Sequence, residues 1–295
     1  MHHFLKADTL MTHQPNRTLR HFPIAMGCLA LTLSTTACTA ARGSFNRTLQ
    51  VNGPVTLRVA TGSGNVHVIS GDPSSVRVVA RVQAMGLFNA QDRVRQVENN
   101  PPIEQSGNNI NIGRTTPSGV SIDYDITVPS STQLSIHSGS GDLRIINIAG
   151  STSADTGSGD IQADGLGGHI SIRTGSGDVR AGFENSNDIQ IRTGSGDLIL
   201  KNVQGILVAH TGSGDIHIGG TPSGGWNIKT GSGDVTLDTA SAHYSIDATT
   251  GSGDIHSDQS ITTHGNLGHH HLIGDVNGGG PTVKIATGSG DIRIH

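Results

Sequence analysis

The sequence predicts an all-β protein: a single-stranded β-solenoid (β-helix) with rungs of 18–20 residues and a short helical insertion near the N-terminal end. Three observations support this fold class. The tetrapeptide Gly-Ser-Gly-Asp recurs along the chain, and seven successive aspartates lie 18 to 20 residues apart. Two short runs of alternating hydrophobicity separate each copy from the next. The 295 residues include 42 glycines but only 3% aromatic residues, which suits a thin stacked core of branched aliphatic side chains.

Residues 1–37 have the pattern of a signal peptide. Arg17 and Arg20 precede an apolar run at 22–33, which is too short to span a bilayer comfortably. We therefore expect an exported protein.

The residues around Cys38 are similar to a bacterial lipoprotein cleavage site. Small residues lead directly to this cysteine, so we expect Cys38 to be lipidated. An ordinary secreted chain cleaved near Ala40 is the alternative. Residues 38–47 are expected to form a short tether. The other cysteine, Cys28, lies in the apolar run, so the mature chain lacks a pair for a disulfide.

The solenoid domain is expected over residues 48–295. A variant corner that ends in Asn65 places the first rung early in this range. Residues 84–120 break the strand pattern and are expected to be an insertion or cap at one end. Within them, helical spacing follows Asn89, a candidate N-cap, and prolines from Pro101 onward end the helix.

The repeated motif is interpreted as a corner between two strands. Glycines on each side of the serine allow a tight reversal, the preceding threonine can bond from rung to rung, and the aspartate can bond to the backbone of its own turn. The predicted corner aspartates are Asp142, Asp160, Asp178, Asp197, Asp215, Asp234, Asp254 and Asp291.

The C-terminal part is expected to continue the same order of rungs. Residues 272–275 look like a degenerate corner with an expanded loop, and the chain stops in mid-rung after Asp291. An open last rung is an unpaired strand edge, so end-to-end self-association of copies is a candidate interaction.

A calcium-binding β-roll is an alternative interpretation of the aspartates. Calcium takes six to eight oxygen ligands, and one Asp, one Ser and some carbonyls in each rung supply too few. We expect no cofactor, with calcium kept as the alternative. Outward basic residues flank the aspartates on both sides and are expected to offset their charge. They also form a candidate interaction face, made of Arg144, Arg173, Arg180, Arg192 and Lys229.

Two further kinds of site are weaker. His269, His270 and His271 could bind a metal ion, although adjacent histidines rarely point to one centre. A carbohydrate-active β-helix enzyme is a second alternative function. However, every rung repeats the same Ser and Asp, and no rung departs from the pattern as an active site should. The sequence therefore favours a protein that is not an enzyme, with no catalytic residues.

The sequence resembles the β-strand-repeat "putative adhesin" family of bacterial envelope proteins, a domain of unknown function. The resemblance rests on "TGSGNVHV", on "SIDYDITVPSSTQLSIHSGSGDLRI" and on the serial "TGSGDI" units, and it covers residues 48–295. It implies a solenoid-like β domain outside the cytoplasm and no established catalysis.

Together these features predict an exported, non-enzymatic envelope protein with an adhesin-like or scaffolding role. It would be periplasmic or on the cell surface, held by a lipid on Cys38, most simply as an outer-membrane lipoprotein. Its expected partners are the membrane and an envelope glycan or protein. The chain has a net charge of -4 and no basic run, so nucleic acid is not expected.

Overall fold

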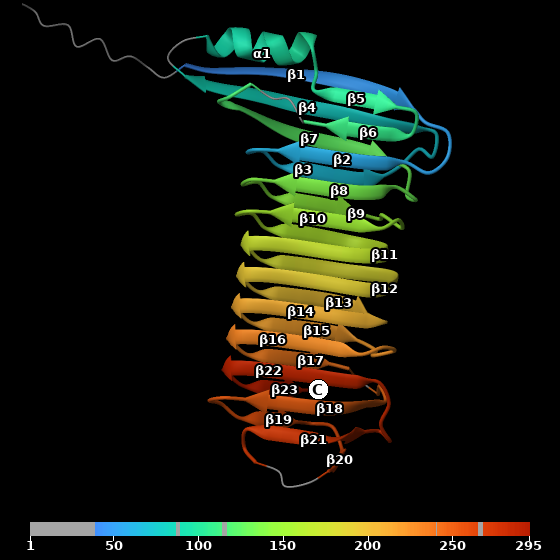
Figure 1. Ribbon diagram of the computed structural model, residues 1–295, viewed down its shortest axis with the longest axis vertical. Helices are drawn as coiled ribbons and strands as arrows, with labels where there is room; N and C mark the ends of the chain where they lie inside the picture. The colour runs from blue at the N-terminus through green and yellow to red at the C-terminus, as the bar shows by residue number, and fades with distance from the viewer. Residues whose placement is uncertain (1–38, 87–88, 114–116, 240, 265–267) are drawn as a thin grey trace, which may run out of the picture. The chain divides into compact units, whose positions relative to one another are not determined.

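The computed structural model describes residues 39–86, 89–113, 117–239, 241–264 and 268–295. Their strands form two stacked layers joined at corners, and Figure 1 shows the strands of successive rungs lying one below the next. In each central rung, one strand of the first layer runs into a GSGD corner and continues as a strand of the second layer. The predicted all-β solenoid with one short helix is confirmed.

The first layer holds the strands that precede the corners. Two long strands, β11 (Ile161–Ser176) and β12 (Val179–Ser195), belong to both layers, because each begins in the second layer and ends in the first. The other strands of this layer are β2 (Thr56–Thr61), β5 (Ile103–Ser106), β6 (Asn109–Ile112), β8 (Gln133–Ser138), β10 (Thr152–Thr156), β14 (Ile206–Ser213), β16 (Trp226–Ser232), β18 (Tyr244–Thr250), β20 (Ile261–Thr263), β21 (His271–Val276) and β22 (Thr282–Ser289).

The second layer holds the strands that follow the corners. At its N-terminal end it is extended by antiparallel strands, since β7 pairs with β4 and β4 with β1. Its members are β1 (Thr39–Gln50), β3 (Val66–Ser70), β4 (Ser75–Gly86), β7 (Val120–Val128), β9 (Leu143–Ile146), β13 (Leu198–Val203), β15 (Ile216–Gly220), β17 (Val235–Asp238), β19 (Ile255–Ser257) and β23 (Ile292–Ile294).

A single aliphatic core fills the slot between the two layers. Strand alternation points every second side chain inward, and parallel pairing stacks equivalent residues of neighbouring rungs. Ile172, for example, lies between Ala154 and Ile191, and all three are fully buried. Trp226 is also buried, and its indole N–H donates to the Gly205 carbonyl oxygen at 3.1 Å. The inward positions expected from the alternation are confirmed.

The N-terminal end is closed by a cap that begins earlier than expected. Residues 39–47 were expected to be a tether, but they are part of β1, which pairs along its whole length with β4. The physical reason is that Ala41 and Phe45 bury their side chains on the core side of this strand. The first rung, β2 and β3, is also out of sequence order, because it lies between β6–β7 and β8–β9.

Helix α1 (Ala90–Asn99) covers β1 and β4, as Figure 1 shows. Its buried face consists of Ala90, Val94 and Val97, and Glu98 accepts a hydrogen bond from the Ser44 backbone N–H at 2.9 Å. Asn89 occupies the N-cap position as expected, but it has a φ of 57° and its side chain makes no capping bond. The helix within 84–120 is therefore confirmed, and the side-chain cap is not.

The C-terminal rung lies inside the stack, and this corrects the expectation of an open last rung. Strand β22 pairs on one side with β16 and on the other with β18, while β23 lies between β17 and β19. The segment at 272–275 is not a degenerate corner. It belongs to β21, which runs antiparallel to β18 and β20 and covers the edge of the first layer.

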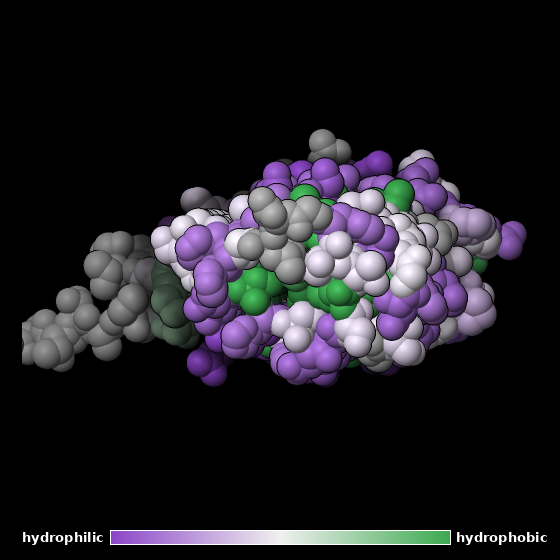
Figure 2. Space-filling model, turned by 90° about the horizontal axis from the view of Figure 1, so that it is seen from below, coloured by the Kyte–Doolittle hydropathy of each residue, from purple (hydrophilic) through white to green (hydrophobic). Residues whose placement is uncertain are grey.

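This end of the stack is therefore formed by β18 to β21, which precede the C-terminal rung in the sequence. Ile255, Ile261 and Leu272 are part-buried there against the core. Figure 2, seen from this end, shows hydrophobic surface in a hollow that hydrophilic residues surround. The predicted association through an open C-terminal rung thus loses its structural basis, because that rung already pairs on both sides.

Candidate functional site

The aspartates of the corners form a ladder that runs along the whole stack. In each step, Oδ1 of one aspartate accepts a hydrogen bond from the backbone N–H of the equivalent residue one rung further on, at N···O distances of 2.8–3.0 Å. The prediction that each aspartate bonds to the backbone of its own turn is therefore wrong. In spatial order the ladder consists of Asp123, Asn65, Asp142, Asp160, Asp178, Asp197, Asp215, Asp234, Asp291 and Asp254.

The threonines and glycines of the corners also act between rungs. The buried Thr193 hydroxyl donates to the carbonyl oxygen of Gly177, one rung earlier, at 3.1 Å, and six further threonines repeat this bond. A Cβ on Gly196 would lie 2.1 Å from the same Gly177 oxygen. Glycine is thus required because the backbones of neighbouring corners approach closely, in addition to the reversal expected from the sequence.

Arginines offset the charge of only part of the ladder. Arg180 contacts Asp178 at 3.0 Å, and Arg293 bridges Asp234 at 2.7 Å and Asp291 at 2.9 Å. The hydrogen bond from Arg293, followed by the Asp291 backbone N–H, lowers the pKa of Asp234 below its usual value. No lysine, arginine or histidine nitrogen of the described residues lies within 4.0 Å of the carboxylates of five other members, Asp123, Asp142, Asp160, Asp197 and Asp215. For those five, the backbone N–H bond is the contact that stabilises the charge.

The five residues of the predicted interaction face do not share one face. Arg144 and Arg180 are on the second layer, in β9 and β12. Arg173, Arg192 and Lys229 are on the first layer, directly before the corners. The corners separate the two groups, so only the first-layer group can form a continuous surface.

Two members of the first-layer group, Arg192 and Lys229, lie on either side of His210, and we call these three stacked basic side chains the basic column. They occupy one register position in β12, β14 and β16. Neighbouring strands are about 4.8 Å apart, so the two permanent charges are separated by two strand spacings. No carboxylate of the described residues lies within 4.0 Å of Arg192 or Lys229, whereas the next member of the register, Arg173, contacts Asp155 at 3.7 Å.

The basic column changes the titration of its central member. Burial, then the positive charges of Arg192 and Lys229, lower the pKa of His210 below 6.5. His210 is therefore mostly neutral near pH 7, and an anion bound across the column would favour its protonated form.

The three adjacent histidines do not meet at one centre. His270 Nδ1 contacts the Gly253 carbonyl oxygen at 2.8 Å, His271 Nε2 lies 3.4 Å from Asp247, and His269 Nδ1 lies 3.9 Å from Asp254. Within the described ranges, no group of three or more His, Cys, Asp or Glu side chains is arranged to hold a metal ion. The structure thus does not bring His269, His270 and His271 together as metal ligands.

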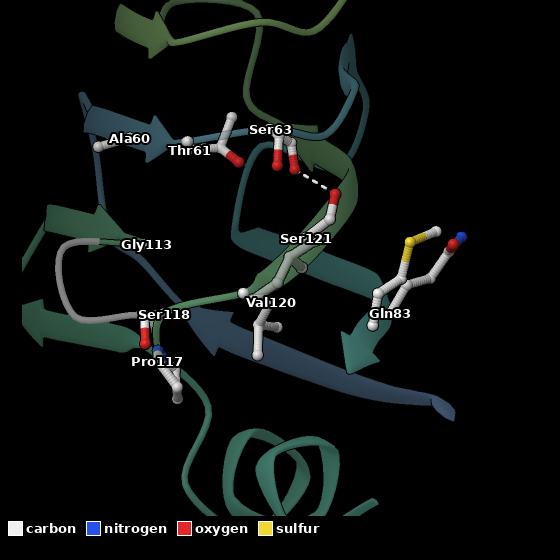
Figure 3. Close-up of a pocket in the computed structure, with 13 residues that line it drawn as sticks. Ala60, Thr61, Ser63, Gln83, Gly113, Pro117, Ser118, Val120 and Ser121 are labelled. Atoms are coloured by element: carbon white, nitrogen blue, oxygen red, sulfur yellow. Dashed lines mark hydrogen bonds between the residues drawn. The ribbon is translucent and has the colours of Figure 1, made fainter. Parts of the chain in front are cut away.

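A cavity of about 730 Å³ lies in the N-terminal cap, between the first corner and the start of β7 (Figure 3). Ser121 Oγ donates to the Ser63 carbonyl oxygen across it. Thr61, Gln83 and Ser118 supply further polar groups. None of the described residues that line it has an ionisable side chain, so these residues offer binding groups but no general acid or base.

Two features of the site were missed from the sequence. Asp123 and Asn65 continue the ladder into the cap, and the only available signal was the Asn-containing variant corner. His210 is not among the residues predicted for the interaction face. Its neighbours in the register show why it matters, because it lies between two unpaired cations. Cys38 lies outside the described residues.

No helix among the described residues is long and apolar enough to cross a membrane. Two solved structures are similar to this chain. One, described as a "putative cell adhesion protein" from Clostridium sporogenes, shares 15% identity and has a TM-score of 0.30, with 86% of this chain and 99% of that chain covered. The other, a "putative adhesin" from Bacteroides fragilis, shares 12% identity with a TM-score of 0.34, covering 86% and 97% of the two chains.

Comparison with curated proteins finds no match to this chain. A family model described as Toastrack DUF4097 matches residues 55–295, which include every described GSGD corner. The chain belongs to the Toastrack DUF4097 family.

Proposed function

We propose that this protein is a non-enzymatic, exported protein of the bacterial cell envelope that binds an acidic envelope polymer through the basic column. The observation that carries the proposal is the stacking of Arg192, His210 and Lys229 in consecutive rungs without a carboxylate beside the two permanent cations. Arg192 and Lys229 carry like charges on either side of the mostly neutral His210 and repel each other, and a bound polyanion would relieve this repulsion.

The geometry of the column suits a chain-like ligand. The side chains project from a rigid sheet at one basic side chain per rung, along a line that runs perpendicular to the strands. A polymer with repeated carboxylate or phosphate groups could lie along this line. Lys284 lies in the next rung, β22, two residues before the position that pairs with Lys229. It adds a further positive charge at this end of the basic column.

Localisation is part of the same proposal. The signal-like pattern of residues 1–37 and the lipidation-type Cys38 support export and anchoring as a lipoprotein, and an outer-membrane position follows if the anchor is sorted there. The corner aspartates support the non-enzymatic role, because each uses one carboxylate oxygen to join the next rung.

Binding to a soluble acidic polysaccharide such as polygalacturonate tests the proposal, with neutral dextran as the comparison polymer. We expect binding that weakens with salt and strengthens as the pH falls through the lowered pKa of His210. The double variant R192A/K229A should lose most of the binding. The matched control R144A/R180A removes the same charge from the second layer and should bind like the unmodified chain. Equal losses in both variants would contradict the proposal.

A further inference from the structure

The distribution of charge along the stack is strongly uneven. Strands β1 and β4 with helix α1, which we call the cap layer, contain six arginines and two carboxylates, a net charge of +4. Residues 129–295 contain eight lysines and arginines against sixteen aspartates and glutamates, a net charge of -8. The cap layer is therefore a basic end on an otherwise acidic stack.

Only two of the six cap-layer arginines contact a carboxylate of the described residues. Arg81 contacts Asp125 at 2.7 Å, Arg95 lies 3.8 Å from Asp92, and Arg93 donates to two carbonyl oxygens. The remaining three are exposed, and no carboxylate of the described residues lies within 4.0 Å of them. These three are Arg42 and Arg47 in β1 and Arg77 in β4. The register places Arg42 and Arg77 on the outward face and Arg47, which pairs with the buried Val78, on the other face, so they flank the outer edge of the cap layer from both sides.

An exposed apolar side chain lies at the same end. Met85 is 67% exposed, and it pairs in the β1–β4 register with Ala40. The first described residue, Thr39, pairs with Gly86 beside it. Because β1 starts at Thr39, no tether separates the cap layer from Cys38, the residue expected to carry a lipid.

We propose that the cap layer rests on an anionic membrane surface, with Arg42, Arg47 and Arg77 near the lipid headgroups and Met85 at the interface. Basic side chains close to an anionic leaflet are attracted to it, and one lipid anchor combined with a basic patch binds more firmly than either alone. The net negative charge of the remaining stack is repelled by the same surface, so the solenoid and its basic column project away from the membrane. This inference goes beyond polymer binding and uses different residues.

Vesicle co-sedimentation tests the contact with the chain from Thr39 to His295, which contains all the described strands and has no lipid of its own. We expect binding to phosphatidylcholine vesicles that contain phosphatidylglycerol, and not to phosphatidylcholine alone. Each arginine removed should lower the partition coefficient about fivefold, so R42Q/R47Q/R77Q should lower it about a hundredfold. The control R144Q/R173Q/R180Q makes the same change in net charge on the solenoid and should leave vesicle binding unchanged.

Orientation is tested by fluorescence, because the only native tryptophan, Trp226, is buried. We expect the emission of Met85→Trp to shift to shorter wavelength with anionic vesicles. Ile206→Trp, at a position 51% exposed on the first layer, should not shift. Lack of lipid-dependent binding, equal losses in the two triple variants, or a shift only at position 206 would overturn the inference. R192A/K229A should still bind vesicles while it loses binding to polygalacturonate. The two assays therefore distinguish a failure of the membrane contact from a failure of the proposed polymer binding.

Discussion

The middle of the stack and its two ends follow different rules. From β8 to β16, each rung pairs with the rungs before and after it in the sequence, always in parallel. At both ends the order breaks: the first rung lies between β6–β7 and β8–β9, and the last rung lies between β16–β17 and β18–β19. The outermost strands β1, β5 and β20 run antiparallel to their neighbours, whereas β19, the last strand of the second layer, runs parallel to β23.

This difference shows that the motif specifies how two rungs join but not which two rungs are neighbours. The Asp ladder continues without a break from Asp234 to Asp291 and back to Asp254, although the residue numbers jump. Two corners that share this sequence can therefore form the same hydrogen bonds, whether or not they are consecutive in the chain. This freedom places the C-terminal rung inside the stack, away from the open edge, which is a risk for aggregation.

The largest effect is expected from crowding a central corner. Gly196→Ala would place a Cβ 2.1 Å from the Gly177 oxygen, and backbone on both sides cannot move away. We expect a loss of more than about 3 kcal/mol in the free energy of unfolding, measured in urea. Gly62→Ala at the first corner is the control, because nothing lies within 4 Å of its Cβ, and it should change stability by less than about 0.5 kcal/mol.

The position of the C-terminal rung is tested by two isoleucines that pair in one register, Ile292 in β23 and Ile255 in β19. Ile292 is fully buried between β17 and β19, so Ile292→Ala should cost about 3 kcal/mol. Ile255 is part-buried at the end of the second layer, so Ile255→Ala should cost only about 1 kcal/mol. If chemical denaturation gave the opposite order, the inserted position of the last rung would be wrong.

A smaller effect is expected from removing one step of the ladder. Asp197→Ala removes the acceptor for the Asp215 backbone N–H and should cost about 1.5 kcal/mol. Asp197→Asn keeps an Oδ1 acceptor, as Asn65 does at its own corner, and should cost less than about 0.5 kcal/mol. An alanine variant as stable as the asparagine variant would show that the ladder contributes little.

The smallest expected effect is a change in how the free energy of unfolding depends on pH, caused by the ion pair of Asp234 and Arg293. The lowered pKa of Asp234 contributes stability that is present above its usual value of 3.8 and is lost as the pH falls through the folded-state value. Arg293→Gln removes the main cause of this shift. The variant should therefore be less stable than the unmodified chain at neutral pH, and the two should converge in acid. A constant difference across the acid range would argue against this pair as the cause.

The features that repeat could be predicted from the sequence, because they depend on local chemistry. Alternation placed Ile170, Ile172, Ile189 and Ile191 in the core, and the spacing of GSGD set the rung length. The same alternation predicted that basic residues on both sides of the aspartates point outward. These features depend only on contacts with the neighbouring rung, which repeats the same motif.

The features that depend on distant pairing could not be predicted. The alternation at Ala41, Gly43 and Phe45 is short, and only the pairing with β4 makes it a strand. The insertion of β22 and β23 leaves no local signal, since their corner "TGSGD" is the same as those of the central rungs. The hydrogen-bond donor to each aspartate was predicted wrongly for a related reason. The aspartate's own turn and the neighbouring rung both offer backbone N–H groups, and the sequence does not show which of the two is the donor.

Thermal unfolding of the chain from Thr39 to His295, with excess calcium and with a chelator, tests the central claim most directly. That claim is that the corner aspartates join rungs by accepting backbone hydrogen bonds, and that binding occurs elsewhere on the stack. It predicts the same unfolding midpoint in both conditions. A large rise in the midpoint with calcium would contradict it, because it would show that the ladder binds the ion in the folded state.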